Sequence, residues 1–189
     1  MAGGAGNDVY TVGQAGDRVV ESAGAGADQV VSTITYTLSL NVENLTLFGA
    51  GAINGTGNGG INKIVGNTGG NVINGRAGSD ILTGGAGADT FVFNSALGAT
   101  NVDTITDYNA VADTIQLDDA VFTALVAGAL DAAAFRDGTR ALDASDRIIY
   151  DTTNGALLYD ADGNGAGLAV RFATLSTGLT LSEADFFVI

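Results

Sequence analysis

The feature that most constrains this chain is a strict period of nine residues between Gly57 and Val92. Four nonapeptides follow one another there, each with glycine at positions one and four and an apolar residue at position eight. Position six is occupied in turn by Asn62, Asn71, Asp80 and Asp89, and position eight by Ile64, Ile73, Leu82 and Phe91. Self-similarity at a short fixed period predicts a solenoid in which each unit packs only against its neighbours.

The columns of the repeat have a physical explanation. Six glycine-rich residues can make a tight turn, because glycine has no Cβ and adopts positive φ at little steric cost. The remaining three residues make a short strand whose central apolar side chain points inward, since side chains alternate along a strand. Stacked coils lie about 4.8 Å apart, so position-six oxygens of adjacent coils can share one hard cation. Ca²⁺ takes roughly six to eight oxygens, backbone carbonyls included, and the repeat therefore predicts calcium sites along the turns.

This repeat resembles that of the RTX β-roll of type I-secreted bacterial proteins. The resemblance implies that two nonapeptides make one coil and that calcium lies between units n and n+2, pairing Asp80 with Asn62 and Asp89 with Asn71. Asparagine offers a neutral oxygen, which should weaken those sites. Arg76 stands where the family usually has a second glycine, so its turn is expected to be either strained or shifted. The alternative is a glycine-rich solenoid that holds no metal.

Earlier units extend the pattern toward the N-terminus. Gly3–Thr11 is a complete nonapeptide, Val12–Val20 is degenerate but keeps Asp17, and Ala23–Val31 follows a two-residue insertion. By the same resemblance, Asp8 and Asp28 form an n, n+2 pair and Asp17 is offset to the other side. The glycines expected to contribute turn carbonyls to the metal sites are Gly3, Gly4, Gly6, Gly24, Gly26, Gly66, Gly69, Gly75, Gly78, Gly84, Gly85 and Gly87. Because the array starts almost at the first residue, we expect the chain to be the tail of a longer secreted protein.

A different pattern separates the two arrays. Residues 33–40 alternate at period two and are rich in β-branched side chains, which predicts a strand. Residues 41–47 resemble a segment that recurs between RTX arrays, with Leu45 and Leu47 facing inward, and we expect a plain solenoid coil with no ligand there.

After residue 98 glycine becomes sparse and the nonapeptide gives way to two segments that keep an Asp-x-apolar core, residues 103–108 and 113–117. They resemble the closing coils in the C-terminal domain of serralysin-type proteases and related RTX proteins. That resemblance implies calcium ligation by Asp103, Asp107 and Asp113. The alternative is that these carboxylates simply form a solvated face.

Residues 120–135 are rich in Ala and Leu and carry apolar residues at roughly helical spacing, behind an acidic start suited to a helix N-terminus. We expect two short helices divided at Gly128, the second begun by Asp131, that cover the end of the roll. Residues 147–150, 156–159 and 168–174 are expected to be strands of a meander.

The loop that contains Asp160 and Asp162 opens like a calcium loop, but Arg171 stands where an EF-hand has its closing glutamate, so an ordinary hairpin turn is favoured. Residues 181–189 end in an acid followed by a short apolar run, which resembles the uncleaved secretion signal read by type I exporters.

Composition excludes several classes of function. A formal net charge of −14 argues against nucleic acid and anionic membranes as partners. The chain has no His and no Cys, so it lacks the residues of Ser-His-Asp triads, Cys-His dyads and zinc-protease helices. No apolar run reaches the roughly 18 residues of a membrane span.

The sequence thus predicts a mainly all-β fold: a right-handed parallel β-roll of nonapeptide repeats with a C-terminal cap of short helices and antiparallel strands. We expect partial coils and linking strands in residues 1–50, the central calcium roll and closing coils in 51–117, and the cap with its secretion signal in 118–189, all in one folding unit. The predicted function is a calcium-binding module, with several Ca²⁺ ions, that folds outside the cell after export and has no enzymatic activity. A calcium-dependent structural or adhesive protein that self-associates is the alternative.

Overall fold

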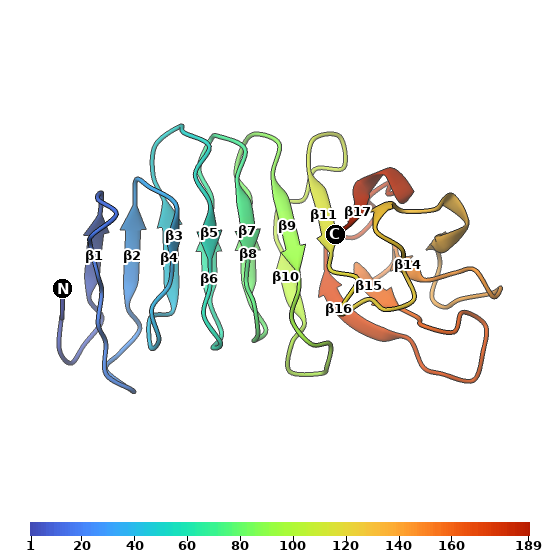
Figure 1. The fold of residues 1–189 in the computed structure, drawn as a ribbon, viewed down its shortest axis with the longest axis horizontal. Coiled ribbons are helices and arrows are strands. Elements are labelled where there is room, and N and C mark those ends of the chain that lie inside the picture. The colour runs from blue at the N-terminus through green and yellow to red at the C-terminus, as the bar shows by residue number, and fades with distance from the viewer.

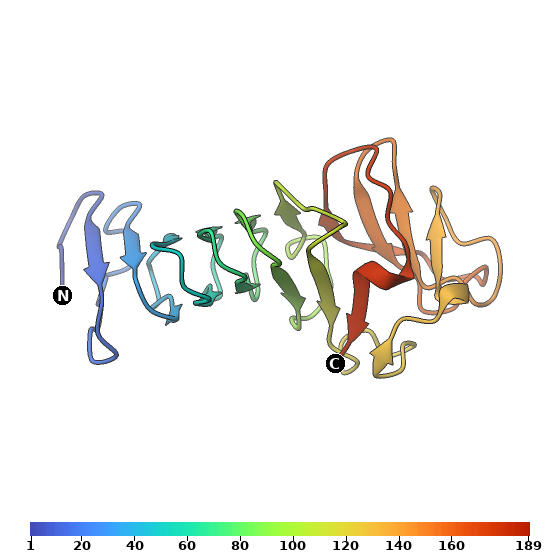
Figure 2. The same cartoon turned by 90° about the horizontal axis from the view of Figure 1, so that it is seen from above.

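The computed structural model describes residues 1–189 and has the shape of a long flattened roll that widens into a cap at its C-terminal end (Figure 1, Figure 2). Seventeen strands form two sheets that lie face to face along the roll. The strand order in both sheets follows the stacking of the coils from the N-terminus toward the cap (Figure 1).

The ten-stranded sheet consists, in spatial order, of β1 (Val9–Val12), β2 (Gln29–Ser32), β4 (Asn44–Leu47), β6 (Lys63–Val65), β8 (Ile81–Thr83), β10 (Asp103–Ile105), β16 (Val170–Thr174), β15 (Ala156–Tyr159), β14 (Ile148–Asp151) and β13 (Phe135–Asp137). The seven-stranded sheet consists of β12 (Gly128–Ala129), β17 (Phe186–Val188), β11 (Thr114–Leu117), β9 (Thr90–Phe93), β7 (Val72–Asn74), β5 (Gly55–Thr56) and β3 (Tyr36–Thr37). Two 3₁₀ turns, η1 (Ala132–Ala134) and η2 (Glu183–Asp185), complete the structure.

The strand register confirms that two nonapeptides make one coil. Lys63 pairs with Ile81 in the ten-stranded sheet, and Val72 pairs with Thr90 in the seven-stranded sheet, in parallel orientation. Each pair joins residues two units apart, so successive units alternate between the two sheets. This alternation places a glycine-rich turn at each edge of every coil.

The position-eight side chains form the core of the roll, as the repeat predicts. Ile64, Ile73, Leu82 and Phe91 each have 0% exposed surface and belong to one cluster of 31 buried residues that continues into the cap. Complete burial of such a side chain stabilises a fold by about 1.5–3 kcal/mol. Each of the strands β6, β7 and β8 buries only its central side chain, so each coil depends on its neighbours.

The strand expected over residues 33–40 is present only at β3. Ser32 ends β2, and its hydroxyl donates to the Ile34 carbonyl at 2.7 Å and accepts the Ile34 amide at 3.2 Å. This local turn directs the chain from one sheet to the other, so the alternating segment is shared between them. Leu45 and Leu47 of β4 are buried, as predicted.

The prediction of two short helices over residues 120–135 is wrong. The segment consists of turns, β12 and the single 3₁₀ turn η1, which Asp131 caps by accepting the Ala133 amide at 2.9 Å. Phe122 is fully buried, with its ring centroid 5.1 Å from those of both Tyr159 and Phe172. Tertiary packing overrides the helix propensity of the segment. The Phe122 ring packs into the cap and Gly128 has φ of 119°, and together these require a chain path that no helix follows.

The predicted meander is present, and it joins the roll. β14, β15 and β16 are antiparallel neighbours, while β16 pairs in parallel with β10. At the other sheet β17 pairs in parallel with β11. Both sheets therefore run from the roll into the cap without a break. Neither 3₁₀ turn approaches the length and apolar character that a bilayer-crossing helix would require.

Candidate metal centre

The turns at the two edges of the roll align their acidic and amide side chains into two columns. The residues of the first column lie at the start of strands of the ten-stranded sheet. Asp8, Asp28, Glu43, Asn62 and Asp80 directly precede their strands, and Asp103 is the first residue of β10. Those of the second column precede strands of the seven-stranded sheet and are Asn71, Asp89 and Asp113. The structure thus brings together Asp80 with Asn62, Asp89 with Asn71, and Asp8 with Asp28.

Within the columns, one oxygen of each of several carboxylates accepts a hydrogen bond from a backbone amide of the preceding coil. Asp80 Oδ1 accepts the Asn62 amide at 2.7 Å, and Asp89 Oδ1 accepts the Asn71 amide at 2.8 Å. Asp28 accepts the Asp8 amide in the same way at 2.9 Å. These charge-assisted bonds hold the carboxylates in a fixed orientation.

The second carboxylate oxygen has no partner. Oδ2 of Asp8, Asp28, Asp80 and Asp89 is buried and accepts no hydrogen bond. Buried polar atoms in native proteins nearly always have a partner, and an unpaired buried charge is costly. These four oxygens are the strongest local indication that a cation belongs in the turns.

The position-one glycines leave room at those oxygens. A Cβ on Gly75 would lie 2.2 Å from Asp80 Oδ2, and one on Gly84 would lie 2.4 Å from Asp89 Oδ2. From the neighbouring coil, the Gly84 carbonyl oxygen would lie 2.1 Å from a Cβ on Gly66. Carbonyl and carboxylate oxygens therefore converge on space that any side chain at these glycines would fill.

Asn62 and Asn71 differ from the aspartates because both ends of each amide are satisfied. Their Oδ1 atoms accept the amides of Asn58 and Asn67, both at 2.8 Å. The Asn62 Nδ2 donates to the Val42 carbonyl at 3.1 Å. The pair of Asn62 with Asp80 and the pair of Asn71 with Asp89 therefore each offer one unpartnered carboxylate oxygen rather than two.

Burial makes the column carboxylates hard to ionise without a counter-ion. It raises the pKa of Asp80 from 3.8 to about 6 and that of Asp103 to about 7, against the opposing effect of the amide that each accepts. The pKa of Asp89 is raised for the same reason and also by the charges of Asp113 and Asp107. A divalent cation would supply the missing positive charge.

The donor set fits calcium. It contains only hard oxygen atoms, from carboxylates and glycine-turn carbonyls, and these are the ligands that Ca²⁺ prefers in proteins. In the repeats, Asp80 and Asp89 would hold the ions, together with carbonyls of the turns at Gly75 and Gly84. The bound ion would neutralise the buried carboxylates and join neighbouring turns.

The other predicted residues lie in several settings. Asp103 and Asp113 continue the columns, since their Oδ1 atoms accept the amides of Asp80 and Asp89 at 3.0 and 2.9 Å. Asp107 instead accepts the Gly84 and Gly85 amides, each at 2.8 Å, with separate oxygens.

Asp17 lies outside both columns. One of its oxygens accepts the amides of Gly13 and Gln14, both at 3.0 Å, and these bonds lower its pKa. Its turn is therefore closed by hydrogen bonds within the degenerate unit.

The remaining predicted glycines shape the turns. Positive φ is present at Gly4, Gly6, Gly24, Gly26, Gly78, Gly85 and Gly87. Gly3 and Gly69 leave no room for a Cβ, which would lie 2.1 Å from Asp8 Oδ2 and 2.7 Å from the Gly51 carbonyl oxygen, respectively. Arg76 has φ of 70°, which agrees with the strain expected for a non-glycine residue there.

Two acidic residues were missed from the sequence: Glu43 in the first column and Glu21 beside it. Glu43 directly precedes β4, as Asp28 precedes β2, and its Oε2 accepts the Asp28 amide at 2.8 Å. The fifteen-residue step between them breaks the nonapeptide period, so only the strand register reveals the match. Glu21 lies within the two-residue insertion, where the repeat predicts no ligand.

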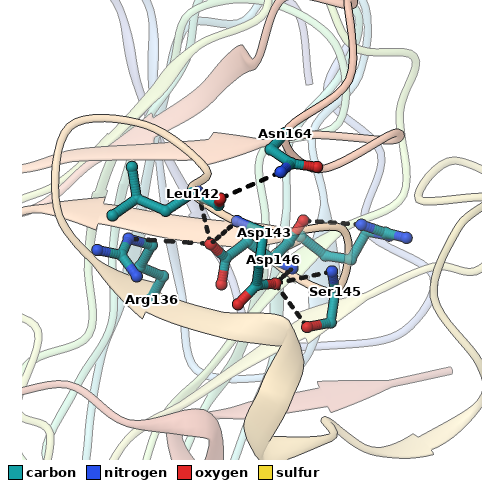
Figure 3. A network of polar contacts seen from close by, with 7 residues as sticks. Arg136, Leu142, Asp143, Ser145, Asp146 and Asn164 are labelled. Carbon is teal, nitrogen blue, oxygen red and sulfur yellow. Dashed lines mark hydrogen bonds and ion pairs between the residues drawn. The ribbon is translucent and has the colours of Figure 1, made fainter.

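The Asp160–Gly165 loop joins the antiparallel strands β15 and β16, as the hairpin interpretation predicts. Asp162 Oδ2 accepts the Gly167 amide at 2.9 Å across the loop. Figure 3 shows how Asn164 holds the loop against a neighbouring acidic turn, where its Nδ2 donates to the Leu142 carbonyl at 3.2 Å. In that turn Asp146 accepts the Leu142 amide at 2.7 Å and lies 3.8 Å from Arg136 Nε (Figure 3). Hydrogen bonds and an ion pair thus account for this network.

Comparison with known families agrees with the geometry of the turns. The family model for the RTX calcium-binding nonapeptide repeat, in four copies, matches residues 56–91. Residues 56–91 are RTX calcium-binding nonapeptide repeats. The match confirms the β-roll interpretation and calcium as the cofactor of the RTX repeats.

A relative shares part of this sequence. A stretch of 51 residues is 43% identical to endo-1,3-1,4-beta-glycanase ExsH of Rhizobium meliloti (strain 1021), and the match covers 27% of this chain and 11% of that protein. The RTX family match ends at residue 91, so the resemblance of the later coils to a serralysin-type C-terminal domain stays a prediction. The individual ligand residues also stay predictions.

Proposed function

We propose that this chain is a calcium-dependent folding module of a secreted protein and has no catalytic activity of its own. The observation that carries the proposal is the set of four buried, unpartnered carboxylate oxygens in the turns. Each represents a cost that the fold bears until a cation is bound. Binding to the folded chain alone then adds directly to the stability of the fold.

The balance of forces favours an unfolded chain at low calcium. Two carboxylates about 4.8 Å apart repel by roughly 1–3 kcal/mol at effective dielectric constants between those of water and a protein surface. The 29 glycines have a high ordering entropy, and each of the strands β6, β7 and β8 buries only one side chain. Extracellular calcium sites bind at about 10⁻⁴–10⁻³ M, so calcium outside the cell would supply the missing free energy.

Export and folding would be coupled through the C-terminal segment. We propose that residues 181–189 are read by a type I exporter while the chain is unfolded. In the folded chain Phe186 and Val188 of β17 are buried, and the Tyr108 hydroxyl donates to Asp185 at 3.0 Å. Folding would therefore withdraw this segment from the exporter once the protein is outside.

Far-UV circular dichroism tests the proposal. The chain is stripped with EDTA and titrated with CaCl₂, with MgCl₂ as the control. We expect a cooperative gain of β-structure between sub-millimolar and millimolar calcium and none with magnesium. A spectrum that is rich in β-structure in EDTA and indifferent to calcium would refute calcium-driven folding. Turnover of β-glucan or ester substrates by the purified chain would refute the absence of catalysis.

Calcium-dependent self-association is a second candidate. β1 forms the edge of the ten-stranded sheet and pairs only with β2, so its outer backbone groups have no partner strand within the chain. Exposed strand edges are templates for pairing with another chain. Light scattering at micromolar protein, with and without calcium, distinguishes the two: oligomers only in calcium favour association, and a monomer in both conditions rules it out.

A further inference from the structure

The first two coils bring together a cluster of three carboxylates outside the matched repeats. One oxygen from each of Asp8, Glu21 and Asp28 lies within 4.8 Å of the others. The cluster has no basic partner, because the one ion pair in the chain joins Arg136 and Asp146. Proximity alone does not make a metal site, so a second observation is needed.

That observation is the state of the two aspartates. Asp28 has 0% exposed surface, and because its Oδ1 accepts the Asp8 amide, its carboxylate faces the turn that contains Asp8. Oδ2 of both residues is buried without a partner. Two aspartates with buried, unpartnered oxygens therefore lie beside a third carboxylate, and no basic side chain forms an ion pair with any of the three.

Glu21 is held in position from both ends. Its Oε1 accepts the Gly3 amide at 3.2 Å and the Tyr10 hydroxyl, and its backbone carbonyl accepts Asn41 Nδ2 at 3.0 Å. Only 9% of its surface is exposed. The two-residue insertion thus directs a carboxylate inward to the turn of the preceding coil rather than into solvent.

We propose that Glu21 is the third carboxylate of a calcium site completed by Asp8 and Asp28, and that this site fills at lower calcium than the sites of the RTX repeats. The proposal rests on the proposed function, in which the turns bind calcium. Calcium affinity rises with the number of charged ligands. The N-terminal cluster offers three carboxylates, whereas Asn62 with Asp80 offers one, since both ends of the Asn62 amide are already bonded.

The opposing explanation is that Glu21 serves only as an acceptor for Tyr10 and Gly3. Glu21→Gln separates the two roles. Glutamine has the same length and keeps a carbonyl oxygen for both donors, but it removes the charge. A purely structural role predicts unchanged calcium binding, whereas a ligand role predicts a selective loss.

Calorimetric titration of the EDTA-stripped full chain with CaCl₂ tests the proposal, with Glu183→Gln in the distant η2 turn as the matched control. We expect Glu21→Gln to weaken the tightest calcium-binding step by about tenfold and to leave the later steps unchanged. Glu183→Gln should leave every step unchanged. Identical isotherms for the wild type and Glu21→Gln would overturn the proposal.

Terbium luminescence provides a second measurement that keeps the proposal testable if Glu21→Gln folds poorly. Tb³⁺ bound beside Tyr10 should be sensitised by tyrosine excitation. Tyr10→Phe should therefore remove more than half of the emission at the first equivalent of Tb³⁺, whereas Tyr36→Phe in β3 should not. Equal emission from both variants overturns the proposal. A wild-type chain that binds no calcium overturns this proposal and the proposed function together. A chain that binds calcium, but whose tightest step is unchanged in Glu21→Gln and whose terbium emission is unchanged in Tyr10→Phe, overturns this proposal alone.

Discussion

Replacing Asp80 by asparagine separates the cost of the buried charge from the benefit of calcium. Burial raises the pKa of Asp80 from 3.8 to about 6, and at neutral pH this shift corresponds to at most about 3 kcal/mol of lost stability in the metal-free fold. Asparagine removes that cost. The column accepts the residue, because Asn62 donates from Nδ2 to the Val42 carbonyl one coil earlier, and the Ile61 carbonyl occupies the equivalent position for residue 80.

With calcium the advantage should disappear. A site with a dissociation constant of about 10⁻⁴ M stabilises the fold by roughly 2.7 kcal/mol at a hundredfold excess of calcium. The Asp80→Asn variant gives up most of this term. We therefore expect it to be more stable than the wild type in EDTA by up to about 3 kcal/mol, and nearly equal to it at saturating calcium.

Chemical denaturation followed by far-UV circular dichroism measures both states, with trimethylamine N-oxide added to bring the EDTA transitions into range. Asp119→Asn, at an exposed residue beyond β11, is the control and should change neither state. The reasoning is refuted if Asp80→Asn destabilises the chain equally with and without calcium, because the carboxylate would then serve the fold and not the metal.

Three further outcomes follow from the turns. In EDTA, the stability of the fold should be greatest near pH 4 and fall toward pH 8. The raised pKa values of Asp80 and Asp103 contribute stability that is fully present below pH 3.8 and is lost as the pH rises through their folded-state pKa values of about 6 and about 7. Acid titration followed by ellipticity checks this, and a rise in stability with pH contradicts it. Gly66→Ala should cost about 1–3 kcal/mol and weaken calcium binding, since its Cβ would lie 2.1 Å from the Gly84 carbonyl oxygen. Its control, Gly59→Ala, has open space at its Cβ and should stay within about 0.5 kcal/mol of the wild type. Equal effects of the two variants in thermal melts would refute the idea that the oxygens converge on the space beside Gly66. Arg76→Gly should stabilise the calcium-bound chain by about 0.5–1 kcal/mol by relieving φ of 70°, and a lower melting temperature would contradict it.

The repeat predicts most of the roll because its information is local. Each nonapeptide carries its own turn glycines, its own acid and its own inward apolar residue, and stacking identical units leaves few other arrangements. The inward position of Ile64 and the alignment of Asp80 with Asn62 follow from period and resemblance alone. Even the strain at Arg76 is visible as a non-glycine residue in a glycine column.

Where the period fails, local pattern loses its predictive power. The apolar spacing of residues 120–135 fits a helix, but burial of Phe122 against Tyr159 and Phe172 decides the path of the chain. These aromatic partners lie more than 35 residues away in sequence, so no window of local sequence contains the deciding contact.

The sequence by itself therefore determined the solenoid, its two residue columns and the calcium chemistry of the repeat, because each depends on residues within one unit. Only the tertiary structure decided where the irregular residues lie. Glu21 and Glu43 reach the first coils through an insertion and a shortened step, and β16 and β17 extend both sheets of the roll into the cap. The physical reason is that strand register across coils, unlike the turn within a coil, is fixed by contacts between distant parts of the chain.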